Sequence, residues 1–134
     1  MPLNKSCFTG ALRVVSNSLP LVDIVNIFGE ALDSYQHKLI YKGSLNNEIG
    51  RIIIEPRAKS FDKADGILEE FSRLFSIIGE VFSCSQSMGL AFDMCVMVEF
   101  EGEKNRFDIS SCLLKQLTDA NINLVFSVYA QSEL

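Results

Sequence analysis

Apolar and polar residues follow two different periods along this chain, and these periods predict where its strands and helices lie. β-Branched and aromatic residues, or a strict alternation of apolar with polar residues, predict strands at residues 11–16, 38–42, 51–55, 91–100 and 122–130. The second and third of these stretches are separated by a polar, turn-like segment, so we expect them to form a hairpin.

Alternation is clearest in the stretch 91–100. One face of this strand is expected to point into the core with Phe92, Met94, Val96, Val98 and Phe100. The opposite face carries Asp93, Cys95, Met97 and Glu99. In the last predicted strand the inward face consists of Ile122, Leu124, Phe126 and Val128.

Apolar residues three and four positions apart predict three helices. The first is expected to be capped by Ser18 and to carry an apolar stripe as far as Leu32. The longest covers residues 62–82, about five to six turns at 3.6 residues per turn, with Ser60 or Asp62 as its cap. The third helix follows a cap at Asp108 or Ser110, and its apolar side holds Leu113, Leu114 and Leu117.

The predicted order is therefore β-α-β-β-α-β-α-β within one domain covering residues 1–134. Such an order is typical of an α+β two-layer sandwich in which helices cover one face of a mainly antiparallel sheet. Its first six elements match a split βαβ (ferredoxin-like) arrangement, to which an additional α-β unit is appended. The other face of the sheet is then open and polar, and we expect function to lie there or on the helix flanks.

Composition narrows the classes of partner. The 134 residues are 48% hydrophobic and 22% charged, which favours a compact fold over a disordered chain. The net charge of −5 disfavours nucleic acid and anionic membranes as partners, because both are bound through basic surfaces. Neither a signal peptide nor a membrane span is predicted, so the expected location is the cytoplasm. An acidic protein is instead suited to a basic partner.

The acidic surplus lies in the later part of the chain. Residues 1–50 hold four acids and four bases, whereas residues 51–134 hold 13 acids and eight bases. The candidate partner-binding residues are acidic: Asp93, Glu99, Glu101 and Glu103, which share one face if the strand continues to residue 103, together with Glu69 and Glu70 on the long helix. A solvated, solubilising edge is the alternative interpretation of the same charges.

No motif for catalysis, metal binding or cofactor binding is evident. The four cysteines, at 7, 84, 95 and 112, contain no Cys-x-x-Cys pair and are expected to be reduced thiols. Cys112, in the first turn of a helix, and Cys84, in a small-residue loop, are the thiols with reactive character, and His37 is the lone histidine. Packed cysteines and a surface histidine are the favoured explanation of these residues, so we expect no catalytic site, cofactor or metal.

Three stretches together carry a family resemblance. They are SNSLPLVDIVNIFGEALDSYQHKLIYKG, SFDKADGILEEFSRLFSIIGEVF and ISSCLLKQLTDANINLVFSVYA. Their succession is similar to a family of small bacterial domains, of uncharacterised function, that recur in the gene neighbourhoods of polymorphic toxins. The resemblance covers nearly the whole chain, and its motifs are structural rather than catalytic.

The resemblance implies a cytoplasmic immunity protein that binds and blocks a cognate toxin domain, such as one delivered in contact-dependent growth inhibition. Toxins of this kind are often nucleases with basic clefts, which an acidic protein can occlude sterically and electrostatically. Two alternatives stay open at this point. One is a small-molecule-sensing or regulatory module, and the other is an enzyme that uses Cys112 or Cys84 with His37. A homo-oligomer is also possible, because the edge of the sheet needs a cover or a partner.

Overall fold

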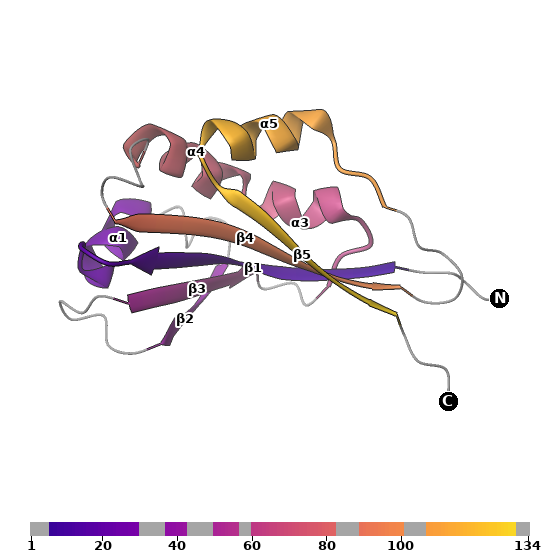
Figure 1. The fold of residues 1–134 in the computed structure, drawn as a ribbon, viewed down its shortest axis with the longest axis horizontal. Helices are drawn as coiled ribbons and strands as arrows, with labels where there is room; N and C mark the ends of the chain where they lie inside the picture. Colours follow the sequence, from indigo (N-terminus) through magenta and orange to yellow (C-terminus); the bar gives the residue numbers. More distant parts are fainter. Residues whose placement is uncertain are drawn as a thin grey trace.

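The computed structural model describes residues 6–29, 37–42, 50–56, 60–82, 89–100 and 107–130, with the backbone alone for residues 6, 37–42, 100 and 130. These residues form nine elements in chain order (Figure 1). They are β1 (Ser6–Ser16), α1 (Leu21–Phe28), β2 (His37–Lys42), β3 (Gly50–Pro56), α3 (Ala64–Glu70), α4 (Ser72–Val81), β4 (Leu90–Phe100), α5 (Ser111–Asp119) and β5 (Asn123–Ala130).

The described strands form one five-stranded mixed sheet in the order β2-β3-β1-β4-β5. β1 pairs antiparallel with both β3 and β4, and β2 pairs antiparallel with β3, which confirms the predicted hairpin. Only β5 runs parallel to its neighbour, β4. The expectation of an α+β fold with a mainly antiparallel sheet is confirmed by these pairings.

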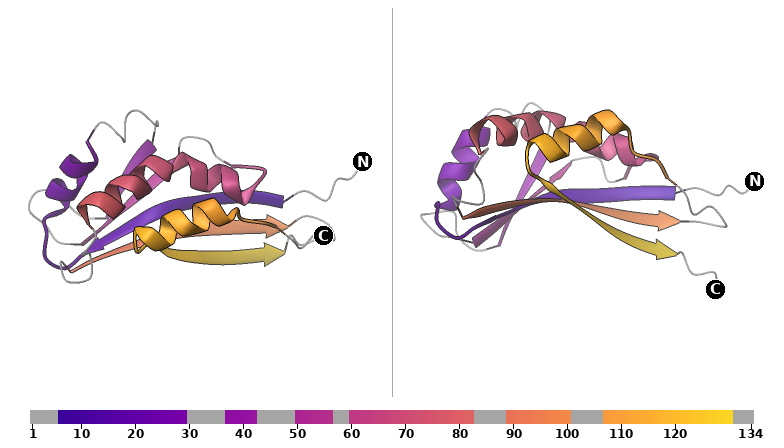
Figure 2. Two further views of the ribbon diagram at one scale, coloured as in Figure 1. Left: turned by 90° about the horizontal axis from the view of Figure 1, so that it is seen from above. Right: turned by 45° about the horizontal axis from the view of Figure 1, so that its top comes forward.

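The described helices all lie on the same side of the sheet (Figure 2). The core fills the space between the two layers and is built from the strand residues that face the helices together with the apolar faces of the helices. Aromatic rings dominate one end of it, where Phe82 lies between Phe28 and Phe92 with ring centroids 6.3 and 5.3 Å away. None of the described helices covers the opposite side of the sheet.

The predicted long helix is interrupted. α3 ends at Glu70 and α4 begins at Ser72, and the residue between them, Phe71, has φ −100° and ψ 1°. Phe71 itself is fully buried, so the core-facing stripe continues across the break. A one-residue interruption that keeps the same face buried leaves the 3.6-residue period intact, and therefore periodicity alone predicted one helix. The predicted caps Ser60 and Asp62 are also wrong, because Lys63 occupies the N-cap.

The start of α1 differs from the prediction as well. Its N-cap is Pro20, with no side-chain cap hydrogen bond, so Ser18 does not have the predicted role. The turn before the helix is held instead by Ser16, whose hydroxyl donates to the Leu19 carbonyl at 2.7 Å and accepts from the Leu19 amide at 3.0 Å. The helix ends at Gly29, where φ is +48°, a conformation that favours glycine. Leu32 lies outside the described residues.

The cap of α5 is confirmed. Ser110 occupies the N-cap and its hydroxyl accepts a hydrogen bond from the Leu113 amide at 3.3 Å. The Ser110 amide in turn donates to the carboxylate of Asp65 on α3, at 2.9 Å. A second link joins α5 to α4, since the Gln116 side-chain amide donates to the Ser72 carbonyl at 2.9 Å. These bonds fix the start and the middle of α5 against the neighbouring helices.

Two strands differ from their predicted form. β1 begins at Ser6, well before residue 11. It does so because β1 pairs with β4 along its whole length, from Ser6 to Ser16. In β5, Ile122 is buried just before the strand, but Val128, predicted to point inward, is 55% exposed. The far end of β5 runs beyond the helices (Figure 2), so a residue on that face has no helix to pack against there.

Candidate functional site

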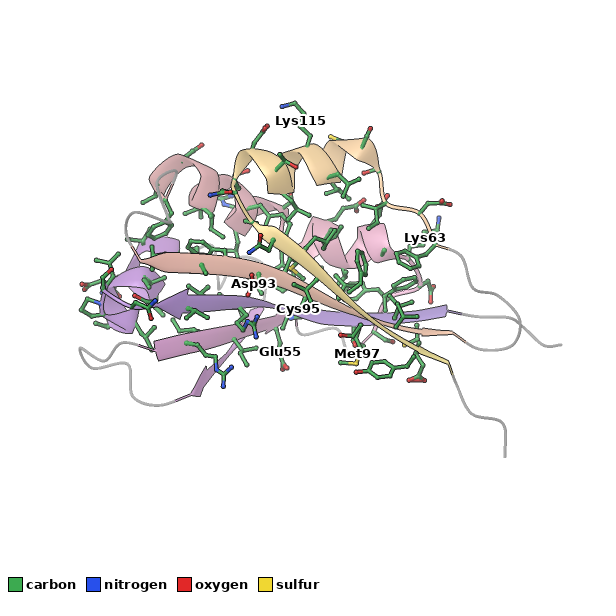
Figure 3. The ribbon with its side chains drawn as sticks, viewed as in Figure 1. Glu55, Lys63, Asp93, Cys95, Met97 and Lys115 are labelled. Carbon is green, nitrogen blue, oxygen red and sulfur yellow. The ribbon has the colours of Figure 1, made fainter. Side chains whose placement is uncertain are left out.

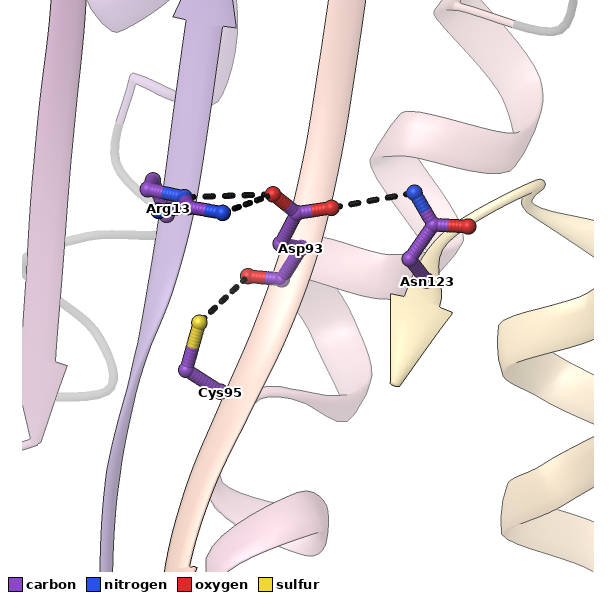
Figure 4. Close-up of polar contacts among 4 residues, drawn as sticks. All are labelled: Arg13, Asp93, Cys95 and Asn123. Carbon is purple, nitrogen blue, oxygen red and sulfur yellow. Dashed lines mark hydrogen bonds and ion pairs between the residues drawn. The ribbon is translucent and has the colours of Figure 1, made fainter. Parts of the chain in front are cut away.

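The open face of the sheet brings together three polar side chains from three neighbouring strands. The register places Arg13 of β1 opposite Asp93 of β4, and Asp93 opposite Asn123 of β5. Because side chains at paired positions point to the same face of a sheet, the three residues form a continuous polar row across its middle (Figure 4).

Asp93 is the central residue of this row. Its Oδ2 atom accepts from Arg13 Nη2 at 2.6 Å and from Arg13 Nε at 3.1 Å. Its Oδ1 atom accepts from Asn123 Nδ2 at 3.0 Å. Both carboxylate oxygens are thereby satisfied although the Asp93 side chain is only 13% exposed. The Arg13 side chain is 39% exposed, so Asp93 is the more deeply buried partner of the ion pair.

The contacts within and around this row shift the pKa values of Arg13 and Cys95. The hydrogen bond to Asp93 and the charge of Asp93 raise the pKa of Arg13 above its ordinary value. Cys95 lies two residues along β4, and its Sγ atom is 4.0 Å from the Asp93 carbonyl oxygen, to which it donates (Figure 4). Burial raises the pKa of the Cys95 thiol, and this outweighs the lowering effect of Arg13. Cys95 is therefore a neutral thiol at physiological pH rather than an activated nucleophile.

Beyond the polar row, the open face becomes apolar towards the ends of β4 and β5. Met97 is 47% exposed, Val125 41% and Tyr129 53%. Figure 3 shows Met97, like Glu55 of β3, on the side of the sheet away from the helices, whereas Lys63 and Lys115 lie on the helix side. Exposed hydrophobic residues that cluster, rather than scatter, are typical of an interaction surface.

Glu99 is the acidic residue of this apolar area. It is exposed, and the register places it between Cys7 of β1 and Tyr129 of β5. We use the name β4–β5 patch for Met97, Glu99, Val125 and Tyr129. A carboxylate beside large exposed apolar side chains combines the two features of a protein-binding surface, an apolar centre and a charged rim.

The other predicted acidic residues have different surroundings. Asp93 shares the face of Glu99, but it is already paired with Arg13 and Asn123. Glu69 and Glu70 lie on α3, in the layer on the opposite side of the sheet, so the structure does not bring them together with Glu99. Glu101 and Glu103 lie outside the described residues.

The predicted cysteine and histidine positions are also dispersed. His37 begins β2, at one edge of the sheet, whereas Cys112 is an exposed residue of α5, which packs against α3, α4 and β5. Cys84 lies outside the described residues. Within the described part of the chain, no group of three or more His, Cys, Asp or Glu residues could hold a metal ion. Of the helices described, none is long and apolar enough to cross a membrane.

Arg13 and Asn123 were not predicted as site residues. Arg13 interrupts an apolar strand and Asp93 interrupts another, so two opposite charges in otherwise apolar strands were the available signal. The signal becomes specific only when the strands are known to be neighbours, and these residues are 80 positions apart.

The described residues thus define an α+β domain in which one sheet face, not covered by any described helix, carries a partly buried ion pair and the β4–β5 patch. No protein-family model, curated protein or solved structure matches the chain. The family resemblance noted in the sequence therefore stays a prediction.

Proposed function

We propose that the chain is an immunity protein that binds a basic toxin domain through the β4–β5 patch and neutralises it by covering its active cleft. The observation that carries this proposal is the exposed carboxylate of Glu99 on an open sheet face beside Met97 and Tyr129. The excess of acids over bases, 17 against 12, supports a partner of opposite charge. Such a protein would act in the cytoplasm, where a delivered toxin has its target.

The physical roles of the patch residues differ. Met97 and Tyr129 would supply the apolar area that is removed from water, and aromatic residues and methionine are enriched in protein interfaces. Glu99 would pair with a cation of the toxin and orient the encounter. Since a charge at the rim of an interface acts mainly on the association rate and its salt dependence, binding should weaken as salt is added.

The Arg13–Asp93–Asn123 row has a supporting role in this proposal. It links β1, β4 and β5 on the same open face, next to the patch along β4 and β5, and satisfies the charge of Asp93 internally. A rigid, preorganised strand surface loses less conformational freedom on binding than a loop does. Asp93 would therefore hold the patch in place rather than contact the toxin.

A calorimetric titration tests the proposal. The purified chain is titrated with the toxin domain encoded beside its gene, and Glu99→Lys is compared with Glu80→Lys, which reverses an exposed charge on α4 in the helix layer. Reversal at Glu99 should weaken binding by about tenfold or more, whereas reversal at Glu80 should change it by less than about twofold. Equal affinity of the Glu99→Lys variant, with an unchanged circular dichroism spectrum, would refute the proposal.

We also propose that the elements from β1 to β4, with α3 and α4 together standing for the second helix, form a split βαβ (ferredoxin-like) unit, with α5 and β5 as the appended α-β unit. The support is the strand order β2-β3-β1-β4 with antiparallel pairing throughout those four strands. An experimental structure that showed a different strand order would contradict this classification.

A further inference from the structure

We propose that the free edge of β5 is a homodimer interface, at which the β5 strands of two copies pair antiparallel and join their sheets. In the part of the chain that the structure describes, β5 has a single neighbour, β4, and forms one edge of the sheet. The inference rests on the strand edge and not on Glu99, although its register also uses Val125 and Tyr129 of the β4–β5 patch.

The sequence of β5 lacks the devices that protect edge strands. Its eight residues, NLVFSVYA, contain no charged residue and no proline. Charged side chains, proline and bulges are the usual means by which edge strands avoid pairing with other chains. Three of the eight residues are large hydrophobics that are more than 40% exposed: Val125, Val128 and Tyr129. The edge is therefore open to a further strand.

The absence of charge on β5 indicates what kind of strand pairs with its edge. A basic partner finds no carboxylate on β5 to bind, although the chain as a whole has a net charge of −5. A second copy of β5, in contrast, meets no like charge, because neither strand carries one. An uncharged edge on an acidic protein thus favours a copy of itself over a charged partner.

The exposed residues of β5 are complementary to themselves in one antiparallel register. When a two-fold axis passes through Ser127, Val125 lies opposite Tyr129 of the second copy on the open face. On the other face Phe126 then lies opposite Val128 of the second copy. Aromatic residues paired with β-branched residues are among the favourable cross-strand pairs of antiparallel sheets. This register covers all three exposed hydrophobic residues of β5 at once.

The same register keeps the acidic residues apart. Glu99 is level with Tyr129, and hence with Val125 and Cys95 of the second copy. At about 4.8 Å between strands and about 3.3 Å per residue, the backbones of the two Glu99 residues are about 19 Å apart, beyond the Debye length of about 8 Å. An interface related by a two-fold axis is closed, so pairing stops at the dimer.

Sedimentation velocity measures dimerisation of wild type and of variants that carry a positive or a negative charge at Ser127, the residue on the two-fold axis. The chain is measured from about 1 µM to about 300 µM, since eight residues a side is small for a stable interface. Wild type should show a concentration-dependent dimer. Ser127→Lys and Ser127→Asp should each raise the dimer dissociation constant about tenfold, because like charges then face each other across the axis. An equimolar mixture of the two variants should dimerise again.

Asn26→Lys is the matched control, because it introduces the same charge at an exposed position of α1, away from β5. It should dimerise like wild type. Circular dichroism of every variant distinguishes lost association from lost folding, and recovery in the mixture requires folded chains. Wild type that stays monomeric at the highest concentration would overturn the proposal, as would Ser127 variants that dimerise like wild type. A Glu99→Lys variant should dimerise normally, so this test and the test of toxin binding can fail separately.

Discussion

Disruption of the Arg13–Asp93 ion pair should destabilise the fold asymmetrically, and the asymmetry follows from the exposure of the two partners. Arg13→Met removes the cation and leaves a carboxylate that is only 13% exposed, with Asn123 as its remaining described partner. Asp93→Asn leaves a guanidinium that is 39% exposed and can be solvated by water. An uncompensated charge is more costly in the less exposed position, so Arg13→Met should be the more destabilising change.

The size of the interaction can be estimated from the same geometry. Two unit charges about 4 Å apart attract by about 4 kcal/mol at an effective dielectric constant of about 20. Desolvation opposes this attraction, and solvent reaches the exposed side of Arg13, so the net contribution must be much smaller. We expect a coupling free energy of about 1 kcal/mol, with a loss of about 2 kcal/mol for Arg13→Met and about 1 kcal/mol for Asp93→Asn.

Urea unfolding of wild type, both single variants and the double variant measures this coupling as a double-mutant cycle. Circular dichroism gives the midpoint, and an unchanged m-value shows that the unfolded state is the same in all four proteins. A coupling below about 0.3 kcal/mol would mean that the two side chains do not stabilise each other, because deviations of that size are expected of residues that do not interact. A greater loss for Asp93→Asn than for Arg13→Met would refute the exposure argument specifically.

Three further predictions concern packing and thiol chemistry. Gly10→Ala should lower the free energy of unfolding by about 2 kcal/mol or more, because its Cβ would lie 2.4 Å from the Cys95 carbonyl oxygen. Gly79→Ala in α4 should raise the free energy of unfolding by about 0.5–1 kcal/mol, since its Cβ would make ordinary contacts with Ala120, 3.5 Å from Cβ and 3.6 Å from Cα. Urea unfolding measures both changes, and a neutral Gly10→Ala would contradict the first. Labelling with a chromogenic disulfide at pH 8 should modify Cys112 before Cys95, because Cys112 is exposed and burial raises the pKa of the Cys95 thiol. Mutation of Cys112 should therefore remove one fast-reacting equivalent of thiol. The folded chain holds the Cys95 proton more tightly than the unfolded chain does, so stability should fall as the pH rises above the ordinary thiol pKa of 9.0, and Cys95→Ala should fall less steeply in the same alkaline unfolding series.

The elements that the sequence predicted well are those with a strong local period. Alternation along β4 placed Phe92, Met94, Val96 and Val98 in the core, and all four are buried. Ser110 capped its helix as expected, because a cap is a contact between residues three positions apart. Patterns of this kind involve only residues that are close together in the sequence, so they can be recognised without knowledge of the tertiary structure.

The features that escaped prediction depend on tertiary contacts. The interruption at Phe71 leaves the apolar stripe unbroken, so no period reveals it. Val128 continues the alternation of β5, but the helices do not reach that end of the strand. The pairing of Arg13 with Asp93 and Asn123 requires the register of three strands that are distant in the chain. Such contacts follow from strand order, which composition and spacing do not determine.

The candidate site was therefore predicted in part. Glu99 was placed on the open face by alternation, and that placement is confirmed. Asp93 was expected on the same face and lies there, but its charge is already satisfied. The apolar neighbours Val125 and Tyr129 join Glu99 only because β5 pairs in parallel with β4. The patch as a combination of charge and apolar area thus emerged from the structure.

Protection of growing cells shows whether the open sheet face around Glu99 neutralises a basic toxin. Bacteria that express the toxin domain encoded beside this gene are grown with wild type, Glu99→Lys or Glu80→Lys at equal protein levels. Wild type and Glu80→Lys should sustain growth, whereas Glu99→Lys should not. Growth sustained equally by Glu99→Lys, or no protection by wild type, would contradict this role of the sheet face.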